Sequence, residues 1–162
     1  MGDAQAAMAF YQLLASVSFT LLGLWFTALN LAHADWRHPG RHRERLHVAL
    51  LFLLPGTLGL TSVLAGSNPI AWRVVFVLGG VIGLGESLVF LIRRRGLPGA
   101  GERVLAVLAP VLYALVVATA FVPTPVAGLV PLQIEGFVVA AVFLVGLTHV
   151  WRAFAERPAP AT

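Results

Sequence analysis

Three charged side chains, two glutamates and an arginine, lie inside segments of the chain that are otherwise apolar. Glu86 occupies the second half of segment 70–92, and Arg73 lies near its start. Glu135 lies near the start of segment 129–151. Placing a charged group inside the hydrocarbon core costs free energy, so such a residue commonly marks an ion pathway, a proton relay or an ion pair that holds two helices together. These residue types therefore indicate the binding or passage of a small ion or proton rather than covalent chemistry.

Glu86 shares one narrow helical face with Gly79 and Gly83, because the three positions recur at helical spacing. Small residues let neighbouring membrane helices approach closely, so these two glycines, and Gly146 in the fifth apolar segment, are predicted to serve helix packing. Arg73 cannot neutralise Glu86, since thirteen residues of helix separate them by roughly 20 Å along the axis. Each charge must therefore find its partner on another helix.

Arg73 and Glu135 lie at matching depths near one membrane boundary, roughly one turn inside it. The sequence therefore predicts a structural ion pair between them. The alternative is that the long arginine side chain reaches the headgroup region instead.

A line of polar and small residues follows the first apolar segment over its full length. Its members, which lie within about 60° of one helical face, are Gln12, Ser16, Gly23, Thr27 and Asn30. The fifth segment has a comparable line with its ionisable groups near the two ends. Such lines face protein or water rather than lipid, which leaves two interpretations open: a water-lined path and a helix-packing face. On the first interpretation the path residues are Glu86, Asn30, His149, Gln12, Ser16, Thr27 and Glu135.

No pattern for nucleotide binding, nucleophilic catalysis or zinc-dependent hydrolysis occurs in the chain. We therefore expect no catalytic residue, no metal, no cofactor and no enzymatic activity. Cysteine chemistry is excluded because the chain contains no cysteine. A third alternative, a haem held by His47 and His149, is the weakest of those considered, because membrane haem sites generally place their histidines deeper in a bundle.

Composition places these residues in a membrane protein. Of all residues 59% are hydrophobic and only 11% are charged, against about a quarter in soluble domains. The sequence predicts an all-α integral membrane protein, a single bundle over 1–157 with a short tail at 158–162. The predicted transmembrane helices cover approximately 7–33, 46–65, 70–92, 104–122 and 129–151. We expect helices one, three and five to lie inward and two and four to be more peripheral.

Arginines border these segments unequally. All eleven basic residues are arginine, and ten of them fall on one predicted side: 37, 41, 43, 45, 93, 94, 95, 103, 152 and 157. The positive-inside rule makes that side cytoplasmic, with the N-terminus outside and the C-terminus inside. The net charge of +4 therefore reflects topology, and no nucleic acid is expected as a partner. Arginine without lysine, in a chain rich in alanine, glycine and proline, is typical of a bacterial protein, so a multi-pass place in the bacterial plasma membrane is expected.

These features together predict a small transport protein, an ion or proton channel or a simple carrier. Five helices leave little room for a path within one chain, so a homo-oligomer in the lipid bilayer is expected, with polar residues of helices one, three and five lining the path. The alternative is a non-catalytic subunit that binds and positions another membrane protein, which needs the same small-residue faces but no water.

The predicted topology has a direct test. A reporter fused after Thr162 should be active in the cytoplasm, and one fused before Met1 should be active outside, because five crossings separate the two ends. Reporters that place both ends on the same side of the membrane would contradict five crossings.

Overall fold

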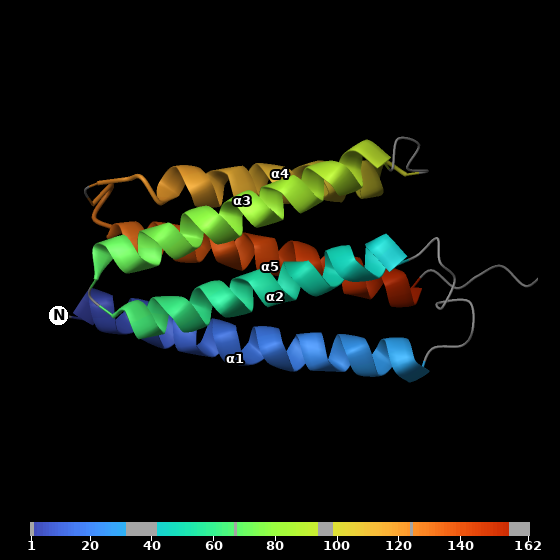
Figure 1. The fold of residues 1–162 in the computed structure, drawn as a ribbon, viewed down its shortest axis with the longest axis horizontal. Helices are drawn as coiled ribbons and strands as arrows, with labels where there is room; N and C mark the ends of the chain where they lie inside the picture. The colour runs from blue at the N-terminus through green and yellow to red at the C-terminus, as the bar shows by residue number, and fades with distance from the viewer. Residues whose placement is uncertain (1, 32–41, 67, 94–98, 124, 156–162) are drawn as a thin grey trace, which may run out of the picture.

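This computed structural model describes residues 2–31, 42–66, 68–93, 99–123 and 125–155. Over these ranges the chain forms five helices that run alternately up and down in one bundle (Figure 1). They are α1 (Gly2–Leu31), α2 (His42–Ala65), α3 (Pro69–Arg93), α4 (Ala100–Thr119) and α5 (Pro131–Ala155). All five are long and apolar enough to cross a membrane, which confirms the predicted all-α membrane class.

The helices begin and end within a few residues of the predicted limits, and prolines explain two of the starts. Pro69 and Pro131 are the first residues of α3 and α5, where a missing N–H costs no helical hydrogen bond. Oδ1 of Asn68 caps α3 by accepting the N–H groups of Ile70 at 3.1 Å and Ala71 at 3.2 Å. The connection from α4 to α5 turns at 127–128, where both residues have positive φ, so α5 starts slightly later than predicted.

The two ends of the bundle differ in charge. We call the end at which α1, α3 and α5 finish the arginine-rich end; the described arginines that border it are 43, 45, 93, 103 and 152. The opposite end, where α1, α3 and α5 begin, carries Arg73 and is called the Arg73 end. Arginines 37, 41, 94, 95 and 157, and the tail 158–162, lie outside the described residues.

Helix α2 lies at the centre of the bundle, which differs from the expected arrangement. It packs against α1, α3 and α5 and is the most buried of the five helices, whereas α1 is the least buried and packs against α2 and α5. The expectation that helix one lies inward and helix two is more peripheral is therefore wrong. The cause is the close contact that glycines on α2 and on its neighbours allow.

Three glycines show how close these contacts are. A Cβ atom added to Gly59 of α2 would lie 2.8 Å from the carbonyl oxygen of Tyr11 on α1. One added to Gly79 of α3 would lie 2.9 Å from Leu58 of α2. One added to Gly146 of α5 would lie 3.1 Å from the Cβ of Leu51 on α2. Each neighbour of α2 therefore meets it at a position where a larger residue would push the helices apart.

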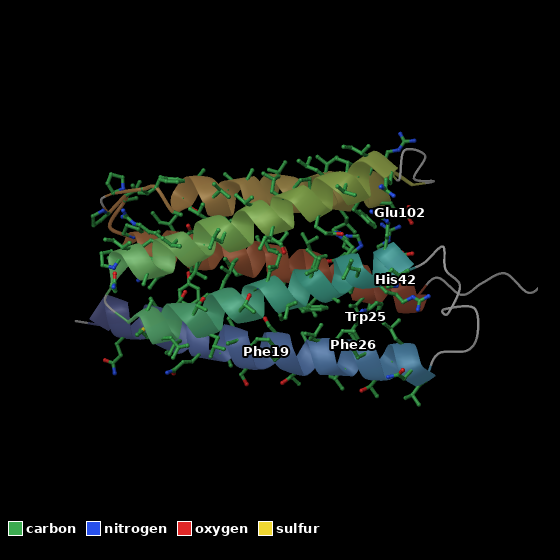
Figure 2. All side chains as sticks on the ribbon, viewed as in Figure 1. Phe19, Trp25, Phe26, His42 and Glu102 are labelled. Atoms are coloured by element: carbon green, nitrogen blue, oxygen red, sulfur yellow. The ribbon has the colours of Figure 1, made fainter. Side chains whose placement is uncertain are left out.

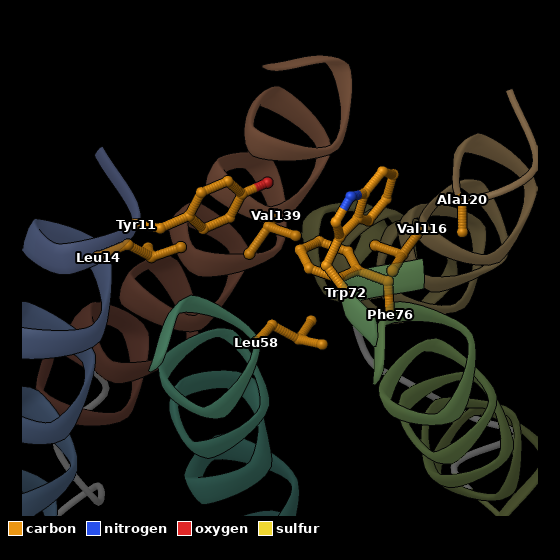
Figure 3. Close-up of a cluster of buried hydrophobic side chains, with 8 residues drawn as sticks. All are labelled: Tyr11, Leu14, Leu58, Trp72, Phe76, Val116, Ala120 and Val139. Carbon is orange, nitrogen blue, oxygen red and sulfur yellow. The ribbon is translucent and has the colours of Figure 1, made fainter. Parts of the chain in front are cut away.

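Buried apolar side chains fill the half of the bundle nearer the Arg73 end (Figure 3). The cluster consists of Tyr11, Leu14, Leu58, Trp72, Phe76, Val116, Ala120 and Val139, so all five helices contribute to it. The Phe76 ring meets Tyr11 and Trp72 edge to face, with ring centroids 5.8 Å and 5.7 Å away. The Tyr11 hydroxyl donates a hydrogen bond to the carbonyl of Leu132 at 2.9 Å, which ties α1 to α5.

Gly83 offers a sharp test of the contact between α3 and α4, because an added Cβ would overlap the ring of Tyr113. Gly83→Ala should lower the free energy of unfolding by about 1–3 kcal/mol through overpacking. Gly85→Ala is the matched control on the same helix, since a Cβ there meets nothing within 4 Å. Thermal unfolding in detergent measures both variants, and equal melting temperatures for the two would show that Gly83 is not in this contact. Tyr113→Leu should restore stability to the Gly83→Ala variant.

Candidate functional site

A histidine and a glutamate form a close polar pair inside the bundle. Nδ1 of His47 on α2 lies 2.6 Å from Oε2 of Glu86 on α3. His47 is 1% exposed and Glu86 is 21% exposed. His47 lies five residues from the start of α2 and Glu86 seven residues from the end of α3, so both sit roughly 8–10 Å inside the arginine-rich end. The acid that the sequence singles out therefore has its partner on the central helix.

Two further rings hold the imidazole of His47. Phe90, one turn beyond Glu86, stacks on it with ring centroids 4.0 Å apart and planes 5° from parallel. His149 of α5 meets it edge to face at 5.3 Å. Three helices thus position one imidazole, and its Nε2 is buried with no hydrogen-bond partner among the described residues.

This arrangement can bind and release a proton. When Glu86 is ionised, the proton of the short hydrogen bond belongs to Nδ1 of His47; a second proton on Nε2 makes the imidazole a cation and the pair neutral overall. Loss of that second proton leaves one negative charge inside the bundle. One proton therefore changes the charge of a site that three helices surround.

The same geometry bears on the haem alternative. The rings of His47 and His149 touch edge to face, with planes 90° apart, and Phe90 covers one face of the His47 ring. No slot for a porphyrin lies between two rings in such direct contact.

Arg73 and Glu135 do not form the predicted ion pair in the described structure. Nη2 of Arg73 donates instead to the carbonyl of Val122 at 2.9 Å, and its guanidinium lies 5.4 Å from the ring centroid of Trp72. Val122 follows the end of α4, where unpaired carbonyls and the helix dipole attract a cation. The prediction was wrong because the carbonyl groups after the end of α4 bind the guanidinium of Arg73 in place of Glu135.

Glu135 is consequently a buried acid without an ion pair among the described residues; the hydroxyl of Thr119 lies near it but donates to the carbonyl of Leu115. It is 0% exposed, and neither carboxylate oxygen has a hydrogen-bond partner among the described residues. The neighbouring Tyr11 hydroxyl is already bonded to Leu132, one turn away on α5. Burial of a polar group without a hydrogen bond is costly, so Glu135 is a second ionisable group that packing alone does not explain.

The polar line of α1 faces away from the other helices. Gln12, Ser16, Gly23, Thr27 and Asn30 are all exposed. Thr27 donates to the carbonyl of Gly23 in its own helix at 2.9 Å. The opposite face of α1, which includes Tyr11, Leu14, Ala15, Ser18 and Trp25, packs against the bundle. The predicted path is therefore not assembled within one chain, because its α1 members lie on the outside while Glu86 and Glu135 lie inside.

Sequence reasoning placed His47 near the same membrane boundary as Glu86 but missed it as the partner of that acid. The signal that could have found it is depth: counted from the arginine-rich end, the two residues lie within two positions of each other along neighbouring helices. Two other contacts tie this end together. Trp25 donates from Nε1 to the carbonyl of Arg45 at 3.3 Å, and Glu102 lies 3.8 Å from Arg152 (Figure 2 labels Trp25 and Glu102).

Comparisons of the chain with protein-family models, with curated proteins and with solved structures find no match.

The pairing of His47 with Glu86 predicts a specific pattern of stabilities. Each single variant, His47→Phe or Glu86→Leu, should lower the free energy of unfolding, because it leaves the other polar side chain buried without its partner. The double variant should therefore lose less stability than the sum of the two single losses. The coupling energy should be roughly 0.5–3 kcal/mol, measured by thermal or denaturant unfolding in detergent. The matched cycle is Arg73→Leu with Glu135→Leu, for which we expect additive effects. Coupling in the second cycle and none in the first would contradict the pairing described above.

Proposed function

We propose that this protein is a small transport protein of a bacterial plasma membrane that moves protons, with His47 and Glu86 as its proton-binding site. The observation that carries the proposal is the 2.6 Å contact between the two side chains inside membrane-spanning helices. Paired ionisable residues at membrane depth are the usual elements of proton relays, because a charge there needs a partner and responds to single protons.

The surroundings of the pair support this function in two ways. Glu86 is partly exposed while His47 is buried, so a proton can enter through the carboxylate and pass to the imidazole. The pair also lies near the arginine-rich end, which the positive-inside rule assigns to the cytoplasm. The site would then exchange protons with the cytoplasmic side in the conformation described here.

Transport across the bundle requires a change of conformation. Between the level of Glu86 and that of Glu135 lies the apolar cluster, including Leu58, Phe76 and Val139, each at most 1% exposed. A carrier that opens alternately to its two sides fits a closed core better than an open channel does. Pro55 lies inside α2, two turns beyond His47, at a position where a helix can bend. Glu135 would be the proton acceptor on the far side of this barrier.

The exposed polar line of α1 supports the expectation of a homo-oligomer, in which α1 would meet another copy. It equally favours a second candidate function, a non-catalytic subunit that binds another membrane protein through α1. Gln12 and Asn30 carry amide groups that lipid cannot satisfy, whereas a neighbouring helix can. The two functions differ in whether the isolated protein moves protons.

Proton flux into liposomes distinguishes them. Purified protein in proteoliposomes with an internal pH-sensitive dye should acidify the lumen under an imposed gradient. Glu86→Gln should reduce the rate at least about tenfold, because it keeps the side-chain shape but removes the titratable carboxylate. Glu102→Gln is the matched control, a carboxylate near the same end that pairs with Arg152 rather than with His47.

Three outcomes are decisive. Loss of flux in Glu86→Gln with normal flux in Glu102→Gln supports the proton site. Equal flux in wild type and Glu86→Gln at every pH removes Glu86 from the path. Wild-type flux no higher than in empty liposomes favours the subunit function.

A further inference from the structure

Two adjoining cavities lie at the Arg73 end, away from the His47 and Glu86 pair. The larger has a volume of about 570 Å³ and lies among the starts of α1, α3 and α5. The smaller, of about 210 Å³, lies between α1 and α5. Ala7 and Leu132 line both, so the two cavities are neighbours along one wall.

The larger cavity is electrostatically suited to an anion. Arg73 lines it, as do Pro69 and Pro131, the first residues of α3 and α5. Asn68 already accepts the first N–H groups of α3, so the two helix starts contribute their dipoles rather than free donors. These dipoles and the guanidinium of Arg73 favour a negative group in the same space. Only one terminal nitrogen of Arg73, Nη2, is shown donating to the carbonyl of Val122. The guanidinium therefore keeps donors for a ligand.

The smaller cavity is suited to a hydrocarbon chain. Its lining from α5 runs from Leu132 to Ala140, roughly 12 Å of helix, with Leu129 just before the helix starts. Phe10 and Tyr11 close it on the α1 side. A Cβ added to Gly136 would lie 3.2 Å from the ring of Phe10, so glycine keeps the two helices close at the floor of this groove. Nearly all of the lining is apolar, and Phe137 is 66% exposed towards the surroundings of the bundle.

The depth of the site matches a lipid headgroup. Helix α3 has 25 residues and is roughly 37 Å long, which exceeds a hydrocarbon core of about 30 Å by a few ångströms at each end. Arg73, four residues from the start of α3, therefore lies close to the boundary between hydrocarbon and headgroups. An arginine at this level can meet a phosphate without leaving the bundle.

We propose that the two cavities together bind one anionic phospholipid of the adjacent leaflet. Its headgroup phosphate meets Arg73 in the larger cavity, and one acyl chain lies in the groove between α1 and α5. The combination of a cation with an apolar groove, at headgroup depth, fits this ligand better than a soluble anion, which needs no groove. The site is independent of the proposed proton transport, and either can fail without the other.

Photoreactive lipids can test whether an anionic phospholipid occupies these two cavities. The protein in phosphatidylcholine nanodiscs receives trace phosphatidylglycerol or phosphatidylcholine with a diazirine in the acyl chain, and cross-linked peptides are mapped by mass spectrometry. Cross-links to residues 129–140 should be about tenfold more frequent with phosphatidylglycerol. Arg73→Gln should abolish this preference and Arg73→Lys should keep most of it. Arg43→Gln is the matched control, an exposed arginine at the other end, and should leave the preference unchanged.

Several results would contradict the proposed lipid site. Equal labelling by the two lipids, or a preference that survives Arg73→Gln, removes the role of the guanidinium. A photoreactive fatty acid that labels the groove in place of phosphatidylglycerol shows that the ligand is a free carboxylate instead. Cross-links between chains through residues 129–140, with no lipid adducts there, show that a second copy covers the groove. Ala140→Trp supplies a second supporting test, since filling the groove should remove the lipid adducts while Arg73 is intact.

Discussion

Close packing against α2 is the constraint on which the rest of the structure depends. In a bilayer the lipid chains are as apolar as the side chains, so helices associate where small residues let them fit tightly. Each neighbour of α2 meets it at a glycine: Gly59 against α1, Gly79 on α3 and Gly146 on α5. This places α2 in the middle of the bundle. The proline and threonines in its sequence do not predict that it is more buried than the other helices.

The central position of α2 determines which polar residues lie inside the bundle and which lie on its surface. It brings His47 into the interior at the depth of Glu86, where the two side chains are 2.6 Å apart. It also leaves α1 at the edge, attached through the face that contains Tyr11 and Trp25. The polar line of α1 consequently points outward, where it can meet another chain but cannot meet Glu86.

The two ends of the bundle have become chemically different. Near the arginine-rich end an imidazole and a carboxylate lie 2.6 Å apart among packed aromatic rings. Near the Arg73 end a guanidinium and two helix N-termini surround a cavity that continues into an apolar groove. A buried apolar cluster that includes Phe76 and Leu58 lies between them. These differences underlie the two proposals, proton transport from one end and an anionic lipid at the other.

The amino-acid sequence by itself determined the five membrane-spanning helices, their approximate limits and the unequal arginines at their ends. These features depend on local properties, namely hydropathy over about 20 residues, proline at helix starts and charge beside apolar segments. Helical spacing also showed that Gly79, Gly83 and Glu86 share a face. Only the tertiary structure decided which face of each helix turns inward and which partner each charge meets. Periodicity groups residues on one face of a helix but does not determine which helix packs against that face. The pairing of His47 with Glu86, and the hydrogen bond of Arg73 to the carbonyl of Val122 rather than an ion pair with Glu135, therefore required the tertiary structure.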